Sequence, residues 1–100
     1  MTMNLTTLLS SKGPVLLDGA VGTQLAEAEL EMGGQANIEA ADEVLRIHRQ
    51  YADSGAQLLI TNTLTMNRVY IETHGVGLDV ETVNLAGAKL AKSAAGENQY

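Results

Sequence analysis

The chain has 100 residues and a formal net charge of −6, so it forms at most one small domain. With only six basic residues it is not expected to bind nucleic acid, because lysine and arginine supply most of the affinity for phosphates. It contains no cysteine, which excludes a disulfide framework and a thiolate zinc site built from this sequence alone.

The N-terminal third is expected to contain a helix, a strand and a second helix. The first helix covers about residues 5–12 and lacks the features of a signal peptide. The apolar run Val15 to Leu17 then indicates a strand that is buried on both faces. Thr23 is placed as the N-cap of a helix over about residues 24–32, which a pair of glycines ends.

The strongest helical signal covers residues 38–54, where apolar side chains recur on one face, and Gly55 is placed to cap its end. Gln57 to Asn62 indicates a second strand after a short turn. A helical or irregular segment covers about residues 65–73. Asp79 is the expected N-cap of a final helix. The buried stripe of that helix is expected to contain Val83, Ala86, Gly87, Leu90, Ala91 and Ala94.

Strands that alternate with helices predict an α/β fold with a parallel sheet. Two strands leave unpaired edges, and parallel strands normally have neighbours on both sides and helices over both faces. The sequence stops at residues 97–100, where a third strand is expected. We therefore expect residues 1–100 to be the beginning of a larger domain and to contain no second domain. No segment approaches transmembrane length, so the default expectation is a soluble cytoplasmic protein that does not bind a membrane.

The first predicted strand leads into a turn that could carry chemistry. Gly19 and Gly22 let backbone amides approach a ligand closely. Asp18 offers a carboxylate at the strand end, which suits an amine or a hydroxyl and repels a phosphate. The same residues are typical of an ordinary βα turn, in which Asp18 accepts a local hydrogen bond. The three glycines of the dinucleotide fingerprint are absent, which argues against a nucleotide or phosphate site.

The second predicted strand ends in Thr61, Asn62 and Thr63. Hydroxyls and amides at this place can orient a substrate, or they can bond their own backbone in turns. The first strand-to-loop junction is Asp18 to Thr23, and the second is Thr61 to Asn67. Because the carboxyl ends of parallel strands open into one crevice, we expect the two junctions to lie together.

The other polar residues have structural interpretations. His48 lies on the apolar face of its helix, remote in sequence from both junctions, so we expect a core or interface histidine with a satisfied ring. His74 is expected at a helix end, and Met66 is expected to fill a gap in the packing. A solvated acidic surface is expected at Glu27, Glu29 and Glu31.

Taken in order, these segments resemble the N-terminal part of the homocysteine S-methyltransferase family, which includes the homocysteine-binding domain of cobalamin-dependent methionine synthase. The resemblance covers about residues 14–95. The chain departs from the family pattern at Val21 and Leu64, where the family commonly has Met and Phe. The matching segments are Leu16 to Thr23, Ile47 to Tyr51, Ser54 to Ala56 and Thr61 to Thr63.

The resemblance implies a (β/α)8 TIM barrel that transfers a methyl group to the sulfur of homocysteine to give methionine. A barrel takes about 250 residues, so residues 1–100 are expected to be its N-terminal βα units only, incomplete in this chain. The residues implied to bind the substrate are Asp18, Gly19, Ala20, Val21, Gly22, Thr23, Asn62 and Thr63.

In the family, zinc held by three cysteine thiolates activates the homocysteine thiol by lowering its pKa. Those cysteines lie beyond the second βα unit, so no catalytic residue and no metal ligand is assigned, and the chain alone is expected to be inactive. The implied partners are homocysteine or another small thiol and, through cobalamin, a corrinoid protein or domain. The methyl donor stays open among methylated corrinoid, methyltetrahydrofolate, S-methylmethionine and betaine. The alternative is a non-enzymatic α/β module that self-associates through open sheet edges.

Overall fold

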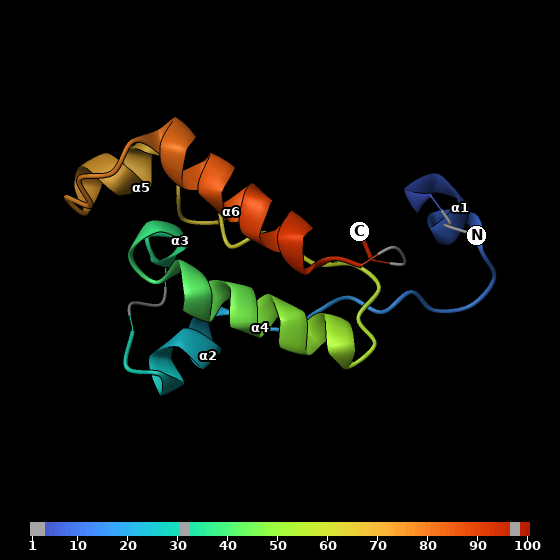
Figure 1. Ribbon diagram of the computed structural model, residues 1–100. Helices are drawn as coiled ribbons and strands as arrows, with labels where there is room; N and C mark the ends of the chain where they lie inside the picture. Colours follow the sequence, from blue (N-terminus) through green and yellow to red (C-terminus); the bar gives the residue numbers. More distant parts are fainter. Residues whose placement is uncertain (1–3, 31–32, 97–98) are drawn as a thin grey trace.

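The computed structural model describes residues 4–30, 33–96 and 99–100. In these residues the chain forms helices and extended segments, with no strand assigned (Figure 1). The predicted α/β fold, with the first units of a TIM barrel, is therefore wrong. The helices are α1 (Leu5–Ser10), α2 (Gly22–Glu27), α3 (Ala36–Glu39), α4 (Ala41–Asp53), α5 (Arg68–Thr73) and α6 (Val80–Ala94).

The two segments predicted as strands lie side by side but share only one parallel bridge, between Leu17 and Leu58. The Asp18 amide donates to the Leu58 carbonyl at 2.9 Å, and the Leu58 amide donates to the Leu16 carbonyl at 3.1 Å. Tyr100 pairs with the same segment, since its amide donates to the Gln57 carbonyl at 2.9 Å. The runs are thus extended and paired, as their composition indicates, without forming a ladder.

The described residues form no ladder because the apolar side chains of the two extended segments are not covered by other parts of the chain. Parallel strands are stable when both of their faces are covered. Here Leu16, Leu17 and Ile60 remain 55%, 57% and 57% exposed. The helices pack on one another instead, with α4 lying along α6 and α3 contacting both (Figure 1).

Local capping signals explain several helix ends. The Asp79 carboxylate accepts from the Thr82 amide at 2.9 Å, which confirms Asp79 as the N-cap of α6. The predicted cap at Thr23 is wrong, because α2 begins at Gly22, two residues before the predicted start, and its N-cap, Val21, makes no side-chain cap bond. Helix α2 also ends earlier than predicted, at Glu27. Residues 31–32, the predicted end of that helix, lie outside the described residues.

The helix predicted over residues 38–54 is divided at Ala40, where the backbone leaves the helical region with φ −146°. Gly55 follows α4 with φ +106°, a conformation that side chains rarely adopt, so its predicted place at the helix end is confirmed. In α6 the expected stripe is buried at Val83, Gly87 and Ala91.

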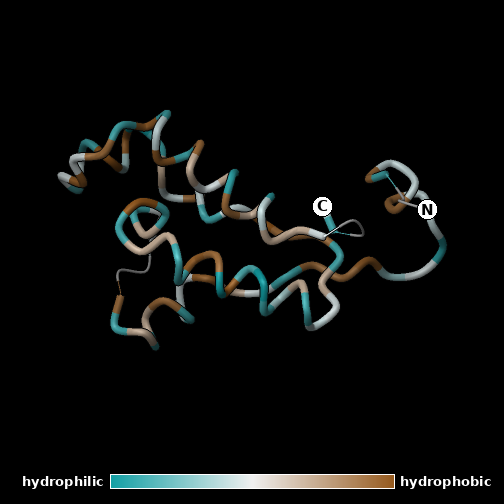
Figure 2. The backbone as a smooth tube through the Cα atoms, viewed as in Figure 1, coloured by the Kyte–Doolittle hydropathy of each residue, from teal (hydrophilic) through white to brown (hydrophobic). Residues whose placement is uncertain are grey.

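The core consists of two clusters of buried side chains. One joins α2, α3 and α4, and the other joins α5 and α6 with the loop before them. Figure 2 shows hydrophobic and hydrophilic positions alternating along α4 and α6, as expected for helices with one buried face. None of the helices in the described part of the chain is long and apolar enough to cross a membrane. The first cluster consists of Leu25, Ala36, Val44 and Ile47. The second cluster consists of Met66, Ile71 and Val83.

Candidate functional site

The loops that follow the two extended segments enclose a cleft of about 280 Å³. The first junction lines it with Gly19, Val21 and Gly22, and the second junction lines it with residues 60–65, which include Asn62 and Thr63. The structure therefore brings five of the eight residues proposed from the sequence to one cleft. Ala20 and Thr23 are exposed and are not among its lining residues.

Asp18 links the two junctions. Its Oδ2 accepts a hydrogen bond from the Ile60 amide at 3.1 Å, across 42 positions of sequence. The structural interpretation of Asp18, a local hydrogen bond within its own turn, is therefore wrong. Its other oxygen, Oδ1, is buried and has no hydrogen-bond partner among the described residues. Asp18 is not among the residues that line the cleft, whereas its neighbour Gly19 and its hydrogen-bond partner Ile60 are.

Tyr51 of α4 contacts the turn that follows Asp18. The Tyr51 hydroxyl donates to the Ala20 carbonyl at 2.8 Å. Gly19 lies against the same ring, since a Cβ added there would come within 2.8 Å of the Tyr51 Oη. The sequence places Tyr51 on the apolar face of its helix but gives no partner for its hydroxyl. An aromatic ring with a polar tip on such a face is the one signal that points to this contact.

Gly19→Ala is expected to destabilise the chain by about 0.5–1.5 kcal/mol, because the Tyr51 hydroxyl must move away from the new methyl group and thereby loses its bond to the Ala20 carbonyl. In a Tyr51→Phe background the cost of the same change should fall, since the nearest atom is gone. Urea unfolding of the four chains of this double-mutant cycle measures the difference. Equal costs in both backgrounds would contradict the contact.

The second junction is anchored by Asn37 of α3, which is only 2% exposed. Its Nδ2 donates to the Asn62 carbonyl at 2.7 Å and to the Val83 carbonyl at 3.4 Å. The Asn62 Nδ2 donates in turn to the Gly33 carbonyl at 3.3 Å and to the Asn37 Oδ1 at 3.4 Å. Asn62 is therefore fixed by protein groups where it lines the cleft. Sequence reasoning missed Asn37, whose partners are distant in the chain.

The neighbouring hydroxyls are ordered as well. Thr61 and Thr63 share a hydrogen bond of 2.7 Å between their Oγ1 atoms. The Thr63 methyl group faces α6, where a Cβ added at Gly87 would come within 2.7 Å of it and within 2.6 Å of the Asn37 Nδ2. Gly87 thus allows α6 to approach both residues closely. The second junction is thus held at the edge of the cleft by bonds to α3 and by close contact with α6.

The two histidines have different environments. His74 caps the end of α5, as predicted, and its ring stacks on Tyr70 with centroids 3.9 Å apart. His48 is fully buried, but the expectation of a satisfied ring is wrong, since neither ring nitrogen has a hydrogen-bond partner in the described part of the chain. Burial lowers the pKa of His48, and the charge of Asp18 opposes that shift.

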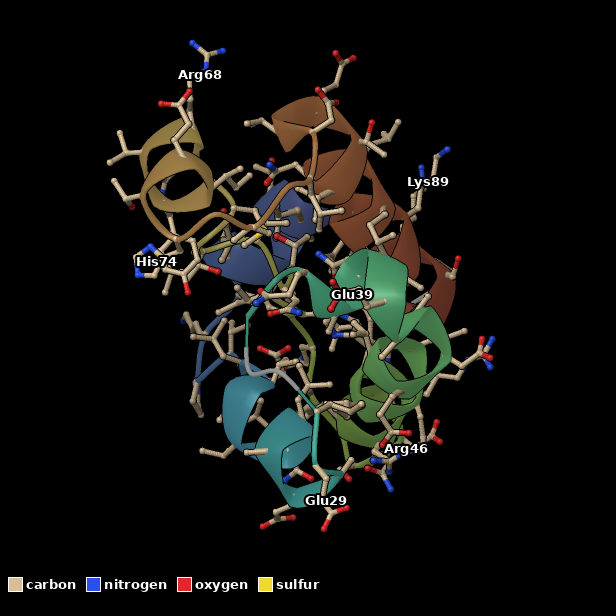
Figure 3. All side chains as sticks on the ribbon, turned by 90° about the vertical axis from the view of Figure 1, so that its left-hand side faces the viewer. Glu29, Glu39, Arg46, Arg68, His74 and Lys89 are labelled. Carbon is tan, nitrogen blue, oxygen red and sulfur yellow. The ribbon has the colours of Figure 1, made fainter. Side chains whose placement is uncertain are left out.

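The charged side chains lie mostly on the outside. Figure 3 shows Glu29, Arg46, Arg68 and Lys89 pointing away from the molecule. Glu27 and Glu29 are exposed, as the predicted acidic surface requires, and Glu31 lies outside the described residues.

A larger hollow of about 410 Å³ lies between α2 and α4. No residue of either junction lines it, and its walls are the flanks of two amphipathic helices. The smaller cleft combines backbone amides, hydroxyls and a carboxylate bonded to one of its lining residues, which are the groups that fix the orientation of a polar ligand. We therefore assign the candidate site to the smaller cleft.

Known proteins match most of this chain. Residues 15–100 match the family model described as homocysteine S-methyltransferase. The methionine synthase of Mycobacterium leprae (strain TN) is 32% identical over 89 residues, which cover 80% of this chain and 7% of that protein. The methionine synthase of Mycobacterium tuberculosis (strain ATCC 25618 / H37Rv) is 29% identical over 89 residues, which cover 80% of this chain and 8% of that protein. The chain thus spans less than a tenth of the length of these curated relatives.

Proposed function

Because the chain belongs to the homocysteine S-methyltransferase family, we propose that its two junctions bind homocysteine, the acceptor of the methyl group. The observation that carries this proposal is the cleft of about 280 Å³ that both junctions line. Its volume is close to the lower end of small-molecule sites, roughly 300 Å³, which suits an amino acid.

Each group at the cleft has a role that follows from its chemistry. The Asp18 carboxylate binds the ammonium group, because charge-assisted hydrogen bonds are the stronger ones. The backbone of residues 19–23 lies near the amino-acid end, where amides can donate to its carboxylate. Asn62 and Thr63 line the opposite wall and orient the ligand. Val21 and Leu64 add apolar surface that suits the methylene groups.

The residues of this chain do not fit the zinc that the family implies. The sequence contains no cysteine, and in the described residues no group of three or more His, Cys, Asp or Glu side chains is placed to hold a metal ion. Any thiolate ligands would come from outside these 100 residues. We propose that the chain binds the substrate without activating its thiol, and that a methyl donor, such as a corrinoid protein or domain, is bound elsewhere.

Asp18→Asn is expected to weaken the binding of L-homocysteine at least about tenfold, because the charge that pairs with the ammonium group is lost. The amide oxygen can still accept from Ile60, so the fold should persist. Isothermal titration calorimetry of the full chain measures the affinity. Asp53→Asn, an exposed acid on α4 away from the cleft, is the matched control and should bind as the original chain does.

Equal affinity of the Asp18→Asn and Asp53→Asn chains would contradict the role of Asp18. A wild-type chain that releases no binding heat and shows no thermal shift with millimolar L-homocysteine would contradict the proposed function as a whole.

A second candidate function is self-association, which the exposed apolar side chains of the junctions favour. Leu17 and Ile60 are each 57% exposed, and Leu64 is 93% exposed. Ile60 and Leu64 line the same cleft, and large exposed apolar side chains that lie together are typical of interaction surfaces. Light scattering after size exclusion should then give a dimer mass that Leu64→Ser with Ile60→Ser returns to a monomer. A monomer at all concentrations would contradict this candidate.

A further inference from the structure

The side chain of Asn62 has one polar atom left for a ligand. Its Nδ2 carries two hydrogens, and the protein uses both: one bond reaches the Gly33 carbonyl at 3.3 Å and the other reaches the Asn37 Oδ1 at 3.4 Å. Its Oδ1 accepts no hydrogen bond from the described residues, yet it is not one of their buried unpaired atoms, so it is open to solvent. Because Asn62 lines the cleft, this oxygen is the atom that a ligand can reach.

The amide of Asn37 has only one orientation that its surroundings allow. Its Nδ2 faces two backbone carbonyls, that of Asn62 at 2.7 Å and that of Val83 at 3.4 Å. Turning the amide over would bring its oxygen against both carbonyl oxygens, and no water is at hand to compensate, because Asn37 is only 2% exposed. The Asn37 Oδ1 is therefore held on the side that faces the Asn62 Nδ2.

The orientation of Asn37 in turn fixes the orientation of Asn62. The Asn37 Oδ1 and the Gly33 carbonyl are both acceptors, and both bond the Asn62 Nδ2. A reversed Asn62 amide would place its own oxygen against these two oxygens and lose both bonds. Because each bond is at the long end of the usual range, the orientation depends on both acceptors together. Removal of Asn37 should therefore free the Asn62 amide to turn.

We propose that Asn37 is a positioning residue for the cleft: it holds the Asn62 amide so that Oδ1 faces the ligand and accepts a hydrogen bond from an N–H group. An ammonium group has three N–H donors, so it can bond Asn62 in addition to the Asp18 carboxylate. A carboxylate at the same place would be repelled by the Asn62 oxygen. That the ligand is an α-amino acid rests on the proposed function, whereas the orientation of the two amides does not.

The first test measures the orientation of Asn62 by NMR without a ligand. The side-chain NH2 protons of Asn62 should exchange with water at least about tenfold more slowly than those of Asn67, an exposed amide that uses only its Oδ1. Asn37→Ala should remove most of that protection, whereas Asn37→Asp retains an acceptor for the Asn62 Nδ2 and should keep it. Equal exchange at Asn62 and Asn67 in the original chain, a comparison that needs no variant, would overturn the orientation.

The second test measures the binding of L-homocysteine by isothermal titration calorimetry, at a temperature at which every chain is folded. Asn37→Ala should weaken the binding about fivefold, which corresponds to the loss of most of one hydrogen bond. Asn37→Asp is expected to be destabilised as well, but it should bind within about twofold of the original chain because the acceptor for the Asn62 Nδ2 is kept. Equal losses of affinity in the two variants, or a loss in neither, would overturn the positioning role.

An analogue of homocysteine that lacks only the amino group tests which group of the ligand Asn62 accepts from. Its affinity should be the same for the original and Asn37→Ala chains, since it offers no N–H to the Asn62 oxygen. A loss as large as that for homocysteine would overturn the assignment of an N–H donor. If the original chain binds no homocysteine, the proposed function fails, and the exchange rates of the Asn62 side chain still decide whether Asn37 orients its amide.

Discussion

Asn37→Ala is expected to lower the free energy of unfolding by about 2–4 kcal/mol. The change removes the donor to the Asn62 carbonyl and a longer bond to the Val83 carbonyl, which lies within α6 and keeps its helical partner. The Asn62 carbonyl left unpaired costs about 1–3 kcal/mol. It also empties the space that the Asn37 amide fills beside Gly87. Because α3, α6 and the second junction meet at this side chain, the loss is expected to act on the whole chain rather than on α3 alone.

Urea unfolding followed by circular dichroism measures this change, with Glu39→Ala, an exposed residue of the same helix, as the matched control. The control should stay within about 0.5 kcal/mol of the original chain. Asn37→Asp keeps the shape but replaces the amide donor, so it should destabilise as well. A loss below about 1 kcal/mol for both Asn37 variants would contradict the anchoring role of this amide.

Leu25→Ala is expected to cost about 2–5 kcal/mol, the range for truncating a fully buried leucine. Leu25 is 0% exposed and packs with Val44 and Ile47, so it fastens α2 to α4. The first two residues of α2, Gly22 and Thr23, belong to the first junction. The truncation should therefore also loosen the turn that lines the cleft, which faster hydrogen exchange of the residue 19–23 amides would report.

The matched control is Leu85→Ala on α6, where the side chain is 51% exposed. The same chemical change at an exposed site should cost about 0.5 kcal/mol or less. Equal losses at the two positions would show that α2 is not held by the buried cluster, and the described packing of the first junction would then be wrong.

Local signals in the sequence predicted the parts of the fold that depend on few residues. Asp79 caps α6 because its carboxylate meets an amide only three residues ahead, and Gly55 ends α4 because only glycine adopts its φ freely. The division at Ala40 has no such signal, since alanine favours helix. The division at Ala40 follows α3, in which Asn37 bonds the Asn62 and Val83 carbonyls. No local pattern in the sequence reveals those bonds.

A β-sheet requires extended backbone and also pairing of the strands into a ladder, and the sequence predicted only the first of these correctly. Apolar runs such as Val15 to Leu17 indicate extended backbone, and the extended pairing at Leu17 and Leu58 follows. A ladder also requires cover on both faces, which depends on the rest of the fold and not on the run itself. Glycine, hydroxyl and amide side chains drew attention to the two junctions, and the resemblance to a known family implied which of their residues bind a substrate. Tyr51, Asn37 and the unsatisfied ring of His48 are results of tertiary packing.

The most direct test of the central claim is a backbone-amide NMR titration of the full chain with L-homocysteine. If the two junctions form one substrate site, saturable shifts should be largest at Gly19 to Thr23 and at Asn62 and Thr63, and they should vanish together with Asp18→Asn. Shifts confined to the hollow between α2 and α4, at Gln24 and Gln50, would contradict the account, and so would a spectrum that does not change.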